Sequence, residues 1–202
     1  MKFSKFISYF FHPINFPIIG SILYFLLIPE HIYKQQEHLF ITIILIGTYI
    51  FPLFIVLIMK RFGMINSLQM ETIEERKFPI ILFLAISLIL ANWLYQSTIV
   101  DILALFYYGY SLFLIITYVF LKFHIKLSLH MAAIGGLTGF LIYFSSYYQI
   151  NLIYILVALF LTSGVIAYAR LRLQAHNSKE ILLGYFLGVI SQITVFALYH
   201  II

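Results

Sequence analysis

Near the carboxyl end of the chain, a histidine and a carboxylate are spaced for acid–base or nucleophilic chemistry. His176 and Glu180 stand four positions apart, so on a helix their side chains share a face and can touch. A carboxylate that accepts a hydrogen bond from one imidazole nitrogen fixes the tautomer, and the other nitrogen is then free to act as nucleophile or base. The same stretch also allows a plain surface ion pair between Glu180 and Lys179 or Arg172.

Cations, a hydroxyl and a second histidine stand beside long apolar runs in three polar clusters. Arginine and lysine near an imidazole could bind an anionic substrate, because a guanidinium offers a bidentate fork for its oxygens. Taken singly, such cations also serve as membrane anchors, and a serine before a helix also serves as an N-cap. The candidate residues are Arg76 and Lys77 in the first cluster, Lys126, Ser128 and His130 in the second, and Arg170, Arg172, His176 and Glu180 in the third.

The composition places these clusters in an integral membrane protein. Of the 202 residues, 63% are hydrophobic and 9% charged, and the mean hydropathy is +1.05, whereas a soluble domain carries about 25% charged residues. Uncharged runs repeatedly reach the ~20 residues that cross a bilayer as a helix. We therefore predict an all-α polytopic transmembrane bundle of six to seven spans in a single domain, 1–202, with helices near 10–28, 39–59, 78–96, 102–121, 130–147, 152–169 and 181–201.

Seven crossings would bring the three clusters to the helix ends at one membrane face. Eleven lysines and arginines fall on this side, and Lys34 alone falls on the other. The positive-inside rule would make the cation-rich side cytoplasmic, unless the cations are gathered for an anionic substrate. Glycines follow both His130 and Glu180, and small residues let helices approach closely. Spans 130–147 and 181–201 are therefore expected to pack together and to bring His130 towards His176.

The order of the clusters resembles the type 2 phosphatidic acid phosphatase superfamily, a family of lipid phosphatases, over about residues 60–190. The family's third motif is Ser-Arg, five residues, His, three residues, Asp; here Ala169 and Arg170 precede His176 and Glu180 at that spacing. The second, Pro-Ser-Gly-His, is matched by Ser128 and His130, with leucine in place of proline and glycine. The first ends in Arg-Pro; Arg76, Lys77 and Pro79 match only that end, and its lysine has no counterpart at the family spacing.

The resemblance implies a metal-independent phosphatase with no cofactor, which hydrolyses a phosphomonoester or diphosphate of a lipid. His176 would take the phosphoryl group. Glu180 would orient the His176 ring, in place of the family aspartate, and His130 would protonate the leaving oxygen. The phosphate ligands implied or suggested by position are Arg170, Ser128, Arg76, Lys77, Arg172 and Lys126, of which Lys126 could replace the missing lysine. The family resemblance also implies an active site on the outer face of the cell (inner) membrane, against the charge rule.

Two other functions remain open from the sequence. His130, His176 and Glu180 could be ligands of zinc or iron in a membrane metalloenzyme, although neighbouring arginines favour an anion over a cation. A transporter or a non-enzymatic scaffold that binds lipid or anions would use the same cations as ligands. The chain has no cysteine, which excludes disulfides and thiolate chemistry. Its net charge of +5 does not indicate nucleic-acid binding, because a chain of membrane spans has no soluble surface to carry a basic patch.

Overall fold

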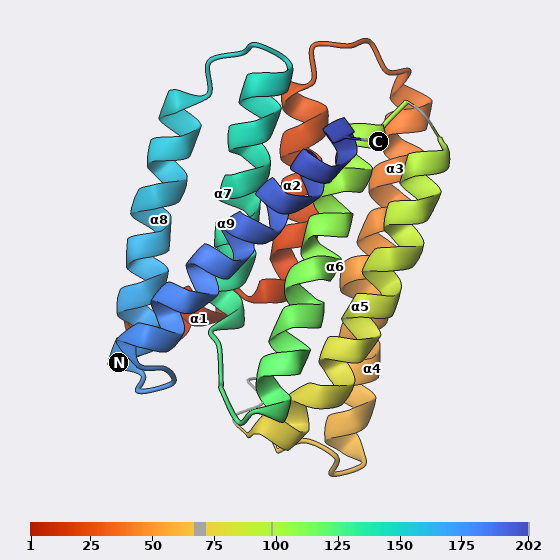
Figure 1. Cartoon of the computed structure of the whole chain (residues 1–202). Coiled ribbons are helices and arrows are strands. Elements are labelled where there is room, and N and C mark those ends of the chain that lie inside the picture. Colours follow the sequence, from red (N-terminus) through yellow and green to blue (C-terminus); the bar gives the residue numbers. More distant parts are fainter. Residues whose placement is uncertain (67–71, 98, 202) are drawn as a thin grey trace.

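The computed structural model describes residues 1–66, 72–97 and 99–201 and is all-helical over these ranges (Figure 1). Seven of its helical segments are long and apolar enough to cross a membrane, within the described ranges. The predicted class, a polytopic helical membrane bundle, is confirmed. The helices are α1 (Lys2–Phe10), α2 (Phe16–Leu27), α3 (Lys34–Leu45), α4 (Phe51–Arg61), α5 (Ile73–Gln96), α6 (Asp101–Lys122), α7 (Leu129–Tyr147), α8 (Ile153–Arg172) and α9 (Ser178–Ile201), with a 3-10 turn η1 (Pro13–Asn15) and a π turn η2 (Ile46–Ile50).

Local signals explain several of the helix boundaries. The chain breaks between α7 and α8 over residues 148–152, between the predicted spans 130–147 and 152–169, where Tyr147, Tyr148, Gln149 and Asn151 form an aromatic and amide cluster. Thr72 begins α5 with a capping box, in which its hydroxyl accepts from the Glu75 amide and the Glu75 carboxylate accepts from the Thr72 amide. Such reciprocal bonds satisfy two amide groups that the helix itself leaves unpaired.

The first predicted span, 10–28, is wrong in its start. The chain forms α1 first, turns at His12 and Pro13, and only then begins α2 at Phe16. Proline fixes its own φ and disfavours the α conformation in the residue before it, which explains the break. Figure 1 shows α1 lying across the lower part of the bundle, against α8. With 12 residues, α2 is about 18 Å long, which is shorter than the ~30 Å hydrocarbon core of a bilayer.

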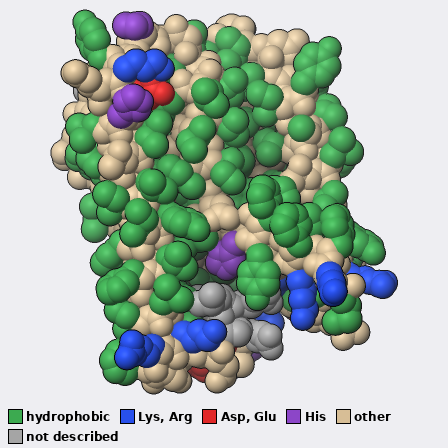
Figure 2. Space-filling view, turned by 180° about the vertical axis from the view of Figure 1, so that it is seen from behind, with side chains coloured by type: hydrophobic (Ala, Val, Ile, Leu, Met, Phe, Trp, Pro, Cys, Tyr) green, Lys and Arg blue, Asp and Glu red, His purple; other side chains and the backbone are tan. Residues whose placement is uncertain are grey.

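The alternating course of the helices puts the three polar clusters at one end of the bundle. In Figure 1 the start of α5, the start of α7, the end of α8 and the start of α9 all lie in the lower half. The lysines and arginines follow the same pattern. In Figure 2 most of their side chains lie at the lower end, and at the upper end blue side chains lie beside acidic and histidine side chains. The predicted convergence at one face is thus seen in the fold.

Glycines let α7 and α9 pack backbone against backbone. A methyl group on Gly188 would overlap the carbonyl of Ala132, and one on Gly135 would overlap the carbonyl of Tyr185. A methyl group on Gly184 would likewise overlap the Ser128 carbonyl, at the point where α7 begins. The expected close packing of these two spans is confirmed, and it draws the start of α7 towards the start of α9.

Candidate active site

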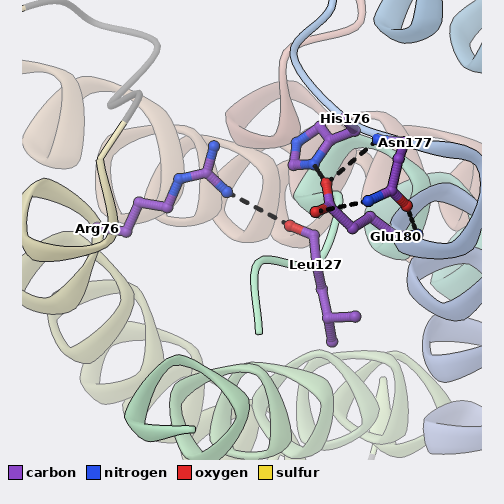
Figure 3. Close-up of polar contacts among 5 residues, drawn as sticks. All are labelled: Arg76, Leu127, His176, Asn177 and Glu180. Carbon is purple, nitrogen blue, oxygen red and sulfur yellow. Dashed lines mark hydrogen bonds and ion pairs between the residues drawn. The ribbon is translucent and has the colours of Figure 1, made fainter. Parts of the chain in front are cut away.

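His176 and Glu180 form the predicted pair. His176 lies in the turn between α8 and α9, with 1% of its side chain exposed, and its Nδ1 is 2.7 Å from Glu180 Oε2 in the first turn of α9 (Figure 3). Nδ1–H donates to the carboxylate, so the lone pair of the neutral ring is on Nε2. This is the arrangement that a histidine nucleophile requires.

Asn177 completes the support of this pair. Its side-chain oxygen accepts from the Glu180 amide at 2.9 Å, and its side-chain nitrogen donates to Glu180 Oε1 at 3.1 Å. The Asn177 amide also donates to the Glu180 carboxylate at 3.4 Å. Asn177 is therefore the N-cap of α9 and Glu180 is its capping-box partner. The Glu180 carboxylate therefore both caps the start of α9 and accepts the hydrogen bond from the His176 ring. The capping geometry of α9 thus sets the orientation of His176.

His176 is neutral at physiological pH. Burial, together with the positive charges of Arg76, Arg170 and Lys126, lowers the pKa of its imidazole to about 3. Each of these effects disfavours the protonated ring. The neighbouring cations would have the opposite effect on a bound phosphate, since they would stabilise its negative charge.

Arg170 and His130 both contact Ser8, which α1 supplies. The Arg170 guanidinium donates from one terminal nitrogen to the Ser8 hydroxyl at 2.5 Å. His130 Nε2 lies 3.0 Å from the Ser8 carbonyl, to which it donates, and 3.5 Å from the Ser8 hydroxyl. Ser8, His130 and Arg170 are all buried. Because a backbone carbonyl only accepts, this contact puts a proton on His130 Nε2.

Arg170 is a buried cation with unused donors. Its side chain is 2% exposed, and its Nε is buried without a hydrogen-bond partner. No ion pair between Arg170 and an acid occurs among residues 1–66, 72–97 and 99–201. A buried charge is costly unless it is paired, so the site has the electrostatics of one that binds an anion.

Arg76 approaches from the opposite side of the site. It is buried in the first turns of α5 and donates to the carbonyl of Leu127 at 3.3 Å (Figure 3). Leu127 belongs to the segment that leads into α7, so this bond joins the first and second polar clusters. Two guanidinium groups from different helices thus lie at one site.

A single cavity is lined by four of the predicted residues: Arg76, His130, Arg170 and His176. The space between the atoms is about 690 Å³, including the part that is open to the outside. Its other walls are mostly apolar, which suits an acyl or isoprenoid chain beside a charged headgroup. The remaining lining residues are His12, Pro13, Ile14, Pro79, Ile80, Phe83, Tyr110, Phe113, Leu114 and Leu129.

The other predicted phosphate ligands lie outside this lining. Lys77 pairs with Glu74 at 2.6 Å on the outer side of α5, and Arg172 is exposed. Ser128 occupies the N-cap position of α7, but its hydroxyl caps no amide and is buried without a partner. Lys126 is half-buried and acts on the site through its charge, since it lowers the pKa of His176.

Ser8, His12 and Tyr110 are site residues that the sequence pattern did not single out. The His12 ring lies edge-on to His130 with 5.6 Å between centroids, and its Nδ1 accepts from the Ile14 amide at 3.4 Å. Tyr110 donates to the Pro13 carbonyl at 3.2 Å. Nothing in the spacing along the chain connects these residues with His130. The cap at Asn177, in contrast, follows the visible Asn-x-x-Glu spacing.

The geometry does not assemble the alternative metal site. Within the described ranges, no three histidine, aspartate or glutamate side chains are placed to hold one metal ion, and this includes the set His130, His176 and Glu180.

Comparisons of the chain with protein-family models, with curated proteins and with solved structures found no match.

Proposed function

We propose that this protein is a membrane lipid phosphatase that hydrolyses a phosphomonoester or diphosphate of a lipid through a phosphohistidine intermediate on His176. The observation that carries the proposal is the cavity, where a neutral histidine oriented by a carboxylate faces the same space as two buried arginines, a second histidine and an apolar wall. The sequence resemblance to the type 2 phosphatidic acid phosphatases supports the same roles for His176, Glu180, His130 and Arg170.

In the first step, Nε2 of His176 attacks the phosphorus atom in line with the lipid oxygen. The N–P bond forms as the P–O bond to the lipid breaks, and His130, which takes up a proton when the phosphate anion binds beside it, gives that proton to the leaving oxygen. Arg76 and Arg170 hold the non-bridging oxygens, where the charge of the transition state lies. Glu180 stabilises the imidazole as positive charge develops on its ring.

In the second step, water replaces His176 on phosphorus. His130, which is now neutral, accepts a proton from the attacking water, and the N–P bond breaks. Inorganic phosphate leaves, His176 returns to its neutral state, and His130 is again protonated. Every proton is accounted for by the two histidines, the water and the lipid product.

The surroundings of the cavity favour a lipid substrate. The arginines suit a phosphate and the apolar wall suits a chain that stays in the bilayer. Phosphatidate, isoprenoid diphosphates and phosphorylated lipid A share this chemistry. We propose that the site faces the outside of the cell membrane, as the resemblance implies, with its cations serving the substrate rather than setting orientation.

The test is a phosphate-release screen with purified protein in detergent over those three lipid classes. We expect release with at least one class and none from His176→Ala. Saturable binding of a lipid phosphate without release would instead support the scaffold or transporter function. Activity that is lost in EDTA and restored by zinc or iron would contradict the proposal in favour of a metalloenzyme.

A further inference from the structure

The first helix presents its polar side to the protein and its aromatic side outwards. Ser4 and Ser8, which stand four residues apart on α1, are buried. Phe3, Phe6 and Phe10 are exposed on the other side of the same helix. Ile7 is also buried, but the large aromatic side chains of the helix face away from the bundle, unlike the apolar face of a helix in a soluble protein. The serines face the bundle instead, and Ser8 contacts Arg170 and His130 there.

The exposed face of α1 suits the boundary between lipid and water. Its phenylalanines stand next to Tyr9, Lys2 and Lys5, all of which are exposed. Aromatic rings together with lysines are typical of helices that lie in the membrane interface. Figure 1 shows α1 crossing the lower part of the bundle rather than running along it, in contact with α8. In this position α1 would lie between the membrane interface and α8, and the contact with α8 places Ser8 beside the site.

Ser8 connects two groups of the proposed mechanism. Its hydroxyl accepts from Arg170 at 2.5 Å, and its carbonyl accepts from His130 at 3.0 Å. Ser8 does not line the cavity itself, whereas Arg170 and His130 do. It stands behind them, more than 120 residues away in sequence from either.

We propose that Ser8 is a positioning residue of the phosphate site, which holds the Arg170 guanidinium so that its other N–H groups are kept for the substrate phosphate. A guanidinium has five N–H donors, and the contact with Ser8 uses one of its terminal nitrogens while Nε stays unpaired. This inference rests on the proposed function. Ser8 also supplies a hydroxyl to a site in which Ala169 stands where the family motif has serine and the Ser128 hydroxyl has no hydrogen-bond partner.

The test compares Ser8→Ala with Ser4→Ala as a matched control. Ser4 lies on the same face of α1, is also buried, and has no side-chain hydrogen bond within the described ranges. The readouts are KM and kcat for a short-chain phosphatidate, and the inhibition constant for orthovanadate, in the full chain. For Ser8→Ala we expect KM and the vanadate constant to rise about tenfold, which corresponds to one hydrogen bond to a charged group, with kcat changed less than threefold. Ser4→Ala should match the wild type.

The pH profile separates the two contacts of Ser8. Alanine keeps the carbonyl that accepts from His130, so the pH dependence of kcat should be the same in Ser8→Ala and in the wild type. Ser8→Thr keeps the hydroxyl and should restore most of the affinity. In an Arg170→Lys background, Ser8→Ala should cost less than threefold, because its effect passes through the guanidinium.

The outcomes distinguish this inference from the function on which it rests. Wild-type affinity for substrate and vanadate in Ser8→Ala overturns the role of Ser8 alone. Full additivity with Arg170→Lys, or equal losses in Ser8→Ala and Ser4→Ala, also overturns it, because both results point to a general effect on folding. If the wild type releases no phosphate from any lipid, the proposed function fails, and the role of Ser8 fails with it.

Discussion

Replacing Glu180 by glutamine tests whether the carboxylate acts through its charge. Glutamine has the same length and can still accept from Nδ1 of His176, a contact of 2.7 Å in the native protein. What it loses is the negative charge that stabilises the imidazole as the N–P bond forms. Removing such a group lowers turnover by something like 10²–10⁴-fold, which is about 3–5 kcal/mol in the activation free energy.

The effect on stability is expected to be much smaller. Glu180 is the capping-box partner of Asn177 at the start of α9, and a cap or a charge at a helix N-terminus contributes about 1 kcal/mol. The side chain of Glu180 is also 22% exposed, so solvent compensates part of that loss. The two magnitudes differ enough that a fall in activity cannot be explained by unfolding.

The assay is steady-state phosphate release at saturating lipid, with the detergent-solubilised melting temperature as the stability readout. The matched control is Glu74→Gln, because Glu74 is exposed and pairs only with Lys77 among the described residues. It should leave both turnover and melting unchanged. Glu180→Asp should recover part of the activity, since it restores the charge at a shorter reach. Wild-type turnover in Glu180→Gln would refute the orienting role and reduce Glu180 to a helix cap.

Three more predictions address the nucleophile, the packing and the orientation. The pKa of His176 is lowered to about 3, so the nucleophile stays neutral as the pH falls. Phosphoenzyme formation, measured by rapid quench, should therefore show no loss from protonation of His176 until about pH 4. A loss centred near pH 6.5, the ordinary pKa of histidine, would contradict this effect of burial. Gly188→Val should separate α7 from α9 and lower the free energy of unfolding by about 2 kcal/mol or more. Gly164→Ala, which meets open space inside α8, should instead raise it by about 0.5–1 kcal/mol through helix propensity; an equal loss in both variants would contradict the packing role. Cysteines placed singly at Asn177 and Lys34 in this cysteine-free chain should react with an impermeant thiol reagent from outside at Asn177 only, and the reverse pattern would put the site in the cytoplasm.

The positions of the spans could be predicted because hydropathy acts locally. Each uncharged run is long enough to cross a bilayer, and the number of crossings alone brings clusters far apart in sequence to one face. The contact of His176 with Glu180 could also be predicted locally, because residues four apart at the start of a helix lie on the same face within side-chain reach. The approach of α7 to α9 followed from their glycines for the same reason.

The contribution of α1 could not be predicted, because it depends on tertiary placement. Ser8 and His12 reach His130 across more than 115 residues of chain, and no periodicity records such a contact. The first span was predicted to begin near residue 10, whereas the chain turns at Pro13 and α2 begins only at Phe16, after α1 has crossed the bundle. For the cations, the sequence suggested too many ligands. Charge alone suggested Lys77 and Arg172, but neither lines the cavity, because the direction of a side chain cannot be predicted from its charge.

The central claim is that His176 becomes covalently phosphorylated. The direct measurement is rapid acid-free quenching of the protein with a lipid substrate labelled in its phosphate, followed by quantification of label that stays on the protein and is released by mild acid. The wild type should carry acid-labile, base-stable label. His130→Ala should carry it after slower formation, and His176→Ala should carry none. Label on His176→Ala equal to that on the wild type, or lipid phosphate release by the wild type with no label at any quench time, would contradict the account.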